Sequence, residues 1–284
     1  MSARVFVLGA GRAGLGLARA LRASGITVAG VHGRRNAGGP DGVTVGPLPA
    51  ALGEATVVLV TVRDAQMDDA IRQLAEAPLA PGAVVLHASG SQDPEALALV
   101  RARGHEAGTF HPLVPLADPA RAAALLRGAW VGVDGDAGAR AAARELAAAL
   151  GAETLEIPAG EKARYHAAAV LVSNFHAVLL ALGERVLAEA GVAPDVARRA
   201  LRPLFFAATE NLREREGAQA LTGPIVRGDV ETVQRHLAAL ASDPEVLEVY
   251  RVLSRAALDV APGAGTEGEK LEAIRRAVTL RSRS

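Results

Sequence analysis

VFVLGAGRAG, residues 5–14, is the stretch of sequence that decides the fold. The apolar run Val5 to Leu8 leads into a glycine-rich turn, and an alanine-rich helical pattern follows over residues 15–23. A strand, a tight turn and a helix in this order are typical of a site for the pyrophosphate of a dinucleotide, because free N–H groups at the start of the helix face the anion. A glycine-rich turn in another kind of α/β protein is the alternative. The predicted cofactor-binding residues of the turn are Gly9, Ala10, Gly11, Arg12, Ala13 and Gly14.

The residues after the second predicted strand, 26–31, indicate which dinucleotide is bound. An NAD site usually has Asp or Glu about 20 residues past the glycines, where it binds the ribose 2′-hydroxyl. No acidic residue lies between Gly9 and Pro40, and Arg34 and Arg35 stand at that position. Arginine stays charged and binds phosphate with two parallel hydrogen bonds. We therefore predict NADP(H), with two solvated surface arginines as the alternative.

Composition sets broad limits. The 284 residues suffice for one large or two ordinary domains, and 50% of them are hydrophobic. The formal net charge is zero, so no basic excess suggests nucleic acid as a partner. Cysteine is absent, which excludes disulfides and thiolate chemistry and fits a cytoplasmic protein. We expect no membrane partner, and we predict that the apolar stretch 167–182 is a core helix because it is short and contains polar residues.

Residues 1–157 predict an α/β domain. Short apolar runs alternate with helical patterns, as a mostly parallel sheet with crossover helices requires. The predicted strands are 5–8, 26–31, 43–45, 57–61, 84–87, 105–110, 130–133 and 154–157, and the predicted helices are 12–23, 68–77, 94–103 and 139–150.

Residues 158–284 predict an all-α domain, since no convincing strand follows Glu161. The predicted helices are 161–190, 194–215, 229–240 and 243–260, and a glycine-rich piece, 262–268, precedes a short terminal helix. We therefore expect a Rossmann-like NADP-binding domain over 1–157 and a helical substrate and dimerisation domain over 158–284.

Three segments follow strands of the predicted sheet, at the edge where ligands of open α/β sheets bind. Thr61, Val62 and Arg63 follow the fourth strand and Ser89 follows the fifth, so we predict that they bind the cofactor. His111, after the sixth strand, is a candidate substrate-binding residue. Its alternative role is to hydrogen-bond its own loop.

A polar stripe is predicted on the first helix of the second domain. Lys162, His166, Ser173 and Asn174 fall near one helical face, with small alanines between them and Tyr165 beside them. Reduction of a C=O or C=N bond needs a polarising group and a proton donor, which His166 or Lys162 can supply. We predict these two and Asn174 as catalytic and Ser173 as substrate-binding. A solvated helix face is the alternative.

The stretch 221–237, LTGPIVRGDVETVQRHL, offers further candidates for substrate binding. Thr222 could cap a turn, and Arg227 is a candidate carboxylate clamp. Asp229 could orient a neighbour, but a helix N-cap is the simpler prediction for it. We expect no metal site, because the histidines lack ligand spacing and cysteine is absent. The GxSxG motif of serine hydrolases is also missing.

Five motifs carry a family resemblance. They are GAGRAG (9–14), HASG (87–90), FHPL (110–113), YHAAAVLVSN (165–174) and LTGPIVRGD (221–229). In this order the chain resembles a bacterial family of NADP-dependent oxidoreductases that join a Rossmann-like domain to a C-terminal helical domain of unknown function. The layout is also similar to ketopantoate reductases, pyrroline-5-carboxylate reductases and β-hydroxyacid dehydrogenases.

The resemblance implies a homodimer formed by the helical domain and an active site in an interdomain cleft. Those relatives use a lysine early in the first long helix of the second domain and an asparagine farther along it. Lys162 or His166, with Asn174, falls in the matching region, and the choice between the first two stays open. The implied reaction is reduction of a ketopantoate-like 2-keto acid. The alternatives are a cyclic-imine reductase, a deazaflavin-linked NADP reductase and a non-catalytic NADP(H) sensor.

Overall fold

The computed structural model describes residues 3–35, 37–215, 217–260 and 268–279. The chain divides into two compact units, Met1–Ser173 and Asn174–Ser284. The division lies after Ser173 rather than after Ile157, where the sequence analysis expects it, because the first turns of the next helix pack on the sheet. Apart from Gly268, the glycine-rich piece expected at 262–268 lies outside the described residues.

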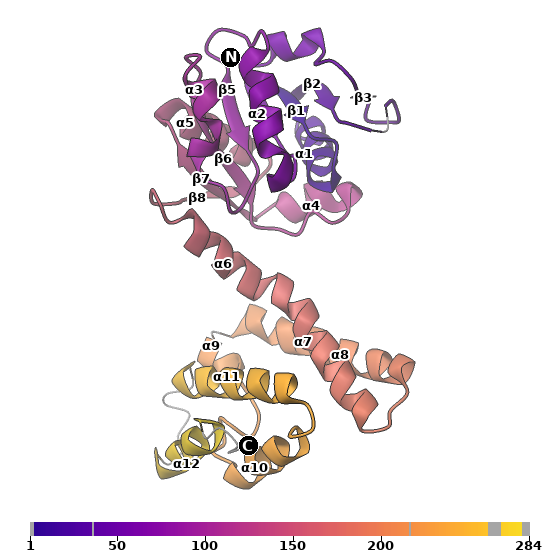
Figure 1. Cartoon of the computed structure of the whole chain (residues 1–284), viewed down its shortest axis with the longest axis vertical. Helices are drawn as coiled ribbons and strands as arrows, with labels where there is room; N and C mark the ends of the chain where they lie inside the picture. The colour runs from indigo at the N-terminus through magenta and orange to yellow at the C-terminus, as the bar shows by residue number, and fades with distance from the viewer. Residues whose placement is uncertain (1–2, 36, 216, 261–267, 280–284) are drawn as a thin grey trace. The chain divides into compact units, whose positions relative to one another are not determined.

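The first unit contains one sheet of eight strands in the order β3-β2-β1-β4-β5-β6-β7-β8 (Figure 1). Each predicted strand overlaps one of them. Neighbours are parallel except β6 and β7, which pair antiparallel with His111 opposite Gly132. The sheet is thus mostly parallel, as predicted. The strands are β1 (Arg4–Leu8), β2 (Thr27–His32), β3 (Val43–Thr44), β4 (Val57–Val60), β5 (Val84–His87), β6 (Ala107–Pro112), β7 (Trp130–Gly135) and β8 (Glu153–Glu156).

Helices cover both faces of this sheet, as crossover connections require. The helix predicted over 94–103 forms as a 3₁₀ turn followed by a short α-helix, and α4 was not predicted. The α-helices are α1 (Arg12–Ala23), α2 (Met67–Glu76), α3 (Ala98–Arg101), α4 (Ala122–Leu126), α5 (Ala137–Ala149) and α6 (Lys162–Val172), and the 3₁₀ turns are η1 (Ala50–Glu54), η2 (Asp64–Gln66), η3 (Pro94–Leu97) and η4 (Pro119–Arg121).

The core has two layers because side chains alternate along each strand. In β1, Val5 and Val7 join the layer formed with α1, α4 and α5, whereas Phe6 and Leu8 join the layer formed with α2 and α3. All four side chains are buried, and burial of each contributes about 1.5–3 kcal/mol. Because β1 is buried on both faces, its residues are apolar without interruption up to the glycine turn.

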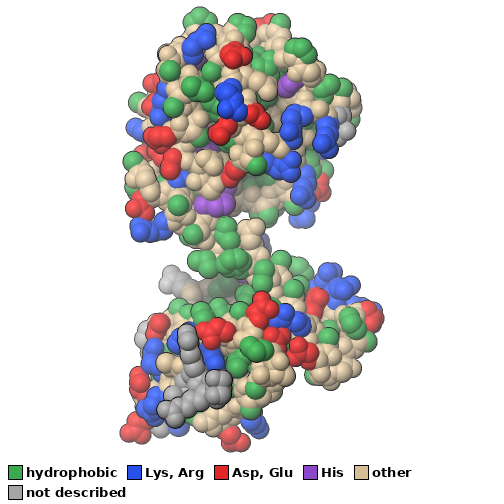
Figure 2. Space-filling model, in the orientation of Figure 1, with side chains coloured by type: hydrophobic (Ala, Val, Ile, Leu, Met, Phe, Trp, Pro, Cys, Tyr) green, Lys and Arg blue, Asp and Glu red, His purple; other side chains and the backbone are tan. Residues whose placement is uncertain are grey.

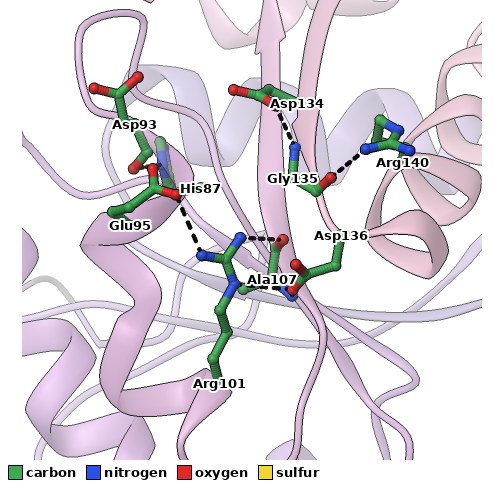
Figure 3. Close-up of polar contacts among 9 residues, drawn as sticks. All are labelled: His87, Asp93, Glu95, Arg101, Ala107, Asp134, Gly135, Asp136 and Arg140. Carbon is green, nitrogen blue, oxygen red and sulfur yellow. Dashed lines mark hydrogen bonds and ion pairs between the residues drawn. The ribbon is translucent and has the colours of Figure 1, made fainter. Parts of the chain in front are cut away.

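An ion pair ties α3 to the antiparallel strands β6 and β7 (Figure 3). The Asp136 carboxylate accepts hydrogen bonds from Arg101 Nε at 2.9 Å and from the Ala107 backbone N–H at 2.8 Å. Burial opposes the charge on Asp136, but these two bonds lower the pKa of the carboxyl. Arg140 donates to the Gly135 carbonyl on the other side of the turn. This network fixes the amino end of β6, whose carboxyl end carries His111.

The second unit is all helical, as predicted, with a small core of Val233, Leu258, Ile274 and Val278. Arg185 joins two of its helices through ion pairs of 2.9 Å with Asp243 and 3.0 Å with Glu245. Its helices are α7 (Asn174–Glu189), α8 (Pro194–Glu214), α9 (Gly217–Ala220), α10 (Val230–Ala239), α11 (Pro244–Val260) and α12 (Gly268–Thr279).

The continuous helix predicted over 161–190 is wrong. Ser173 has φ −118° and ψ −69° and separates α6 from α7. The core helix predicted over 167–182 is also wrong for the chain alone, since no residue of α7 is buried. Hydrophobic side chains lie exposed on the surface of the chain (Figure 2). Phe175 and Val178 of α7 are 46% and 49% exposed, and Leu171 and Val172 at the end of α6 are 62% and 70% exposed.

By length and composition alone, one stretch in the described part of the chain could cross a membrane. It runs over Lys162–Glu189. Lys162 at its start is fully buried against the sheet, and the break at Ser173 interrupts it. Length and hydropathy are weak evidence for a span, and exposed apolar helix faces also mark sites where protein chains associate.

Candidate functional site

The glycine turn has the geometry of a phosphate cradle. Gly9 has φ +125°, a conformation that favours glycine, and its N–H donates to the His32 carbonyl at 2.8 Å. A Cβ at Gly14 would collide with the carbonyl oxygen of Gly9, so only glycine allows α1 to approach β1 this closely. At Gly11, by contrast, a Cβ would meet no atom within 4 Å. The turn therefore leaves open space where a phosphate is expected.

Thr61 holds this turn from the neighbouring strand. Its backbone N–H donates to Leu8 O at 2.8 Å, and its Oγ1 donates to Gly9 O at 2.8 Å. A Cβ on Gly9 would lie 2.7 Å from the Thr61 carbonyl carbon. Thr61 thus has a structural role in positioning the glycine turn, which sequence analysis did not predict.

A cavity of ≈ 570 Å³ opens beside the turn, within the range of cofactor and ligand sites. Eight predicted cofactor-binding residues line it: Gly9, Ala10, Gly11, Arg34, Arg35, Thr61, Val62 and Arg63. Other lining residues were not predicted. They lie at the end of β2, after β3, or in η2 and α2: His32, Gly46, Gln66, Asp69 and Gln73. Their positions at strand ends and in the first turns of a helix were the available signal.

The other predicted cofactor-binding residues do not line this cavity. Arg12, Ala13 and Gly14 form the first turn of α1. Ser89 is buried on the loop after β5, and its Oγ accepts the backbone N–H groups of Ser91 at 3.2 Å and Gln92 at 3.1 Å. Ser89 thus shapes its own loop, and a contact with the cofactor stays a prediction.

The charges around the cavity suit an anion. Arg34 and Arg35 are exposed, and no ion pair holds either of them within the described residues. Asp41, the first acid after them, is bound by Arg19 through two hydrogen bonds of 2.9 and 2.7 Å. The lining acid Asp69 pairs with Arg72. The cradle and two free guanidiniums therefore fit a dinucleotide with an additional phosphate.

Lys162 starts a second group of polar residues at the same edge of the sheet. It is the first residue of α6, its side chain is fully buried, and its Nζ donates to Thr109 Oγ1 at 3.1 Å. Burial lowers the pKa of Lys162 from 10.5 to about 8, and the charges of Asp134 and Asp93 oppose this shift only in part. Near neutral pH its ammonium group can therefore give up a proton more readily than an exposed lysine.

His111 lies between two aromatic rings of α6. Its Nδ1 is 2.8 Å from the Tyr165 hydroxyl, and its ring meets those of Tyr165 and His166 edge to face, with centroids 5.6 and 5.8 Å apart. Gly90 makes room for this arrangement, because a Cβ there would collide with His166 Nδ1 and lie 2.8 Å from His111 Nε2. The loop after β5 and the carboxyl end of β6 thus meet the first turns of α6. His111 lies within β6, opposite Gly132, so its predicted position after the sixth strand is wrong.

Two histidines of this group are neutral near pH 7. Burial is the main cause that lowers the pKa of His111 and of His87 to about 4, and the nearby Lys162 charge adds to it. His87, at the end of β5, lies beside the Asp93 loop, and its Nε2 donates to Asp93 O at 3.1 Å (Figure 3). Because neither imidazole carries a charge, Lys162 is the buried cation of the group.

The structure brings some of the predicted chemical residues together. Lys162, His166 and His111 adjoin one another in the first unit, with Tyr165 between them. Ser173 ends α6 and is exposed, and Asn174, also exposed, begins the second unit. The shared helical face predicted for Lys162 and Asn174 is interrupted by the break at Ser173, so their joint action stays a prediction.

Thr222, Arg227 and Asp229 belong to the second unit. Asp229 Oδ1 accepts the Thr232 N–H at 3.1 Å, which is the N-cap predicted as its simpler role. Arg227 and Thr222 are exposed. Substrate binding by these three residues stays a prediction. Among the residues that the structure describes, no cluster of His, Asp or Glu could hold a metal ion.

Residues 129–257 match the family model described as "Domain of unknown function (DUF2520)". This match covers less than half of the chain. The DUF2520 match begins just before β7 and continues into α11, so it includes Lys162, His166 and Arg227. A search of curated protein sequences finds no match.

Solved structures share the fold. Protein TM1727 from Thermotoga maritima is 21% identical, with a TM-score of 0.71 over 90% of this chain and 98% of that one. A reductive aminase from Aspergillus terreus, in complex with NADPH and ethyl levulinate, is 17% identical, with a TM-score of 0.62 over 98% and 99%.

A pyrroline-5-carboxylate reductase from Coxiella burnetii is 14% identical, with a TM-score of 0.56 over 98% of this chain and 97% of that one. At these identities the likeness establishes the fold, a Rossmann-like domain followed by a helical domain. The resemblance stated from the five sequence motifs is confirmed in its fold and in its domain of unknown function. The likeness in layout to ketopantoate reductases stays a prediction.

Proposed function

We propose that this protein is an NADP(H)-dependent oxidoreductase that reduces a small carbonyl or imine substrate bearing a carboxylate. One observation carries the proposal: the anion-binding cavity and the Lys162 group occupy the same edge of the sheet. The cavity lies at the carboxyl ends of β1, β2 and β4, and the group lies after β5 and along the carboxyl half of β6, which carries Thr109 and His111. Ligands of open α/β sheets bind at this edge.

The cofactor fits the residues of the cavity. The turn from Gly9 would hold the pyrophosphate, and Arg34 and Arg35 would hold the 2′-phosphate of NADP(H). The chemistry that NADPH supplies when bound is hydride transfer. The titration that tests this compares the affinities of NADPH and NADH, and equal or absent binding of both would contradict the proposal.

Lys162 and His166 are the two candidates for the proton donor. A pKa of about 8 allows Lys162 to hold a proton on Nζ at neutral pH and to release it to a developing alkoxide or amide anion. His166 has a buried Nδ1 that no hydrogen bond satisfies within the described residues. Substitution of each in turn separates them, since loss of the donor lowers kcat about 10²–10⁴-fold.

A 2-keto acid resembling ketopantoate and a cyclic imino acid are the two substrate classes to test first. The imine class is supported by two proteins that share the fold, a pyrroline-5-carboxylate reductase and a reductive aminase. Arg227 would bind the substrate carboxylate, so Arg227→Ala would raise KM for an acid and leave KM for its neutral ester unchanged.

The rival function is that of an NADP(H) sensor, which would bind the cofactor tightly without catalysis. Oxidation of NADPH, followed at its own absorbance in the presence of each candidate substrate, distinguishes the two. Turnover that Lys162→Met or His166→Gln abolishes supports the enzyme. Tight binding of NADPH with no turnover across both substrate classes supports the sensor.

We also infer that the protein forms a homodimer through α6, α7 and α8. Each of these helices leaves large apolar side chains exposed, among them Leu204 and Phe206 of α8 at 65% each, and exposed apolar surface marks association sites. Leu204→Glu with Phe206→Glu would give a monomer in light scattering. A wild-type monomer at micromolar concentration would contradict the inference.

A further inference from the structure

Tyr165 and His111 form a hydrogen-bonded pair whose direction can be worked out. The Tyr165 hydroxyl lies 2.8 Å from His111 Nδ1 and 3.4 Å from the His111 carbonyl oxygen. Hydrogen bonds between two oxygen atoms are usually 2.5–3.0 Å long, so the contact with Nδ1 is the one that forms. The pair therefore shares one proton between the phenol oxygen and Nδ1.

The phenol is the donor in this bond. Burial raises the pKa of Tyr165, and the Gly132 backbone N–H that faces the phenol oxygen opposes the shift only in part. The hydroxyl therefore keeps its proton, while its oxygen already has a donor in Gly132. The imidazole of His111 is neutral, since burial lowers its pKa to about 4. A neutral imidazole that accepts at Nδ1 must carry its proton on Nε2.

The Nε2–H group of His111 faces Gly90 and His166. Nε2 lies 2.8 Å from the position that a Cβ of Gly90 would take, and His166 Nδ1 approaches the same position. Among the described residues, His166 Nδ1 is buried without a hydrogen-bond partner, and the hydrogen bond of the His111 ring to Tyr165 is made through Nδ1. The charged and titratable groups around His111 are Lys162, His166, His87 and Asp64.

We propose that Tyr165 is a positioning residue that fixes His111 as its Nε2–H tautomer, which makes His111 a neutral hydrogen-bond donor to the substrate's carbonyl oxygen or imine nitrogen. The second half of this statement rests on the proposed function, and the first half does not. Tyr165 itself does not touch the substrate. Its part is to remove the other tautomer, in which Nε2 would have no proton to donate.

The chain contains a matched control for this pair. The two tyrosines of the sequence are Tyr165 and Tyr250, and Tyr250 also meets a histidine edge to face. Its hydroxyl lies 2.9 Å from His236 Nδ1, in an exposed position of the second unit. Tyr250→Phe therefore removes the same type of bond within the second unit and leaves the Tyr165–His111 pair of the first unit intact.

The tautomer is measured in two-bond ¹H–¹⁵N spectra of protein labelled at histidine, without cofactor or substrate. His111→Asn identifies the signals of His111 by their loss. We expect a neutral ring with Nε2 protonated from pH 6 to pH 8, and a mixture of tautomers in Tyr165→Phe but not in Tyr250→Phe. A wild-type ring protonated on Nδ1, or charged at pH 7, would overturn the proposal even if Tyr165→Phe fails to fold.

Turnover gives the second readout. With a substrate in hand, Tyr165→Phe should lower kcat roughly tenfold while the affinity for NADPH stays unchanged, whereas Tyr250→Phe should lower neither. A normal kcat in a Tyr165→Phe protein of altered tautomer would overturn the donor role of His111. Failure of NADPH to bind at all would instead contradict the proposed function and leave the tautomer assignment standing.

Discussion

Lys162 Nζ donates a hydrogen bond to Thr109 Oγ1 at 3.1 Å, and this contact anchors the first turn of α6 to the middle of β6. The lysine is fully buried, so the bond replaces part of the hydration that its ammonium group loses. The same residue is therefore a structural anchor and a group whose proton is easily lost. Both properties can be measured separately.

The stability of the protein should depend on Lys162 in a defined pH range. The pKa of Lys162 is lowered from 10.5 to about 8 on folding, so between these values the unfolded chain binds the additional proton. The contribution of this group therefore becomes more favourable as pH rises through that range. Between pH 7 and pH 9.5, wild type should gain about 2 kcal/mol relative to Lys162→Met in urea unfolding. Parallel curves for the two proteins would contradict this prediction.

The pH dependence of kcat/KM should also report the ionisation of Lys162. If Lys162 supplies the proton, kcat/KM falls as pH rises above about 8, because the acid form is lost. Lys162→Met should remove this limb of the profile and lower the rate. His166→Gln should keep the limb, so a profile without it in the His166 variant would assign the limb to the histidine.

Gly11 and Gly14 should respond differently to alanine. Gly14→Ala forces a Cβ against Gly9 O and should cost about 1–3 kcal/mol of stability. Gly11→Ala meets no protein atom, so it should unfold at the wild-type temperature and yet bind NADPH at least about tenfold more weakly. Thermal unfolding and cofactor titration check both variants. Normal NADPH binding by Gly11→Ala would show that the phosphate does not bind at this turn.

Gly90→Ala tests the close approach of the two histidines. A Cβ there would push His166 and His111 apart, and a shift of about 1 Å in positioned groups can cost 10²-fold in rate. The affinity for NADPH should change little, since Gly90 is not among the residues that line the cavity. Gly217→Ala, at a glycine with open space around it, is the control. An unchanged rate would contradict a role of these two histidines in the reaction.

Local patterns predicted the parts of the fold that depend on neighbours in sequence. The run from Val5 to Gly14 contains both the apolar strand and the glycines that its turn needs, so strand, turn and helix follow from it. The direction of β7 did not follow, because a buried strand has the same pattern in either orientation. Ser173 carries no glycine or proline signal, so the break between α6 and α7 could not be read from it.

The candidate site was predicted in part for the same reason. Arg34 and Arg35 could be predicted to line the cavity because they stand about 20 residues after the glycines. The contact of Lys162 with Thr109 joins residues 53 apart, and the partner of Tyr165 is 54 residues away. Such contacts depend on the order of strands in the sheet, which the sequence does not state. Tyr165 was named only as a neighbour, although it lies on the same helical turn as Lys162.

The most direct test of the account is a titration of the protein with NADPH and with NADH, followed by calorimetry, for wild type and for the Arg34→Ala, Arg35→Ala double variant. Arg202→Ala, at an exposed arginine of α8, is the control. The account predicts that wild type prefers NADPH, that the double variant loses about 10–100-fold in affinity for NADPH alone, and that the control loses none. Equal affinity of wild type for the two dinucleotides, or an unchanged preference in the double variant, would contradict it.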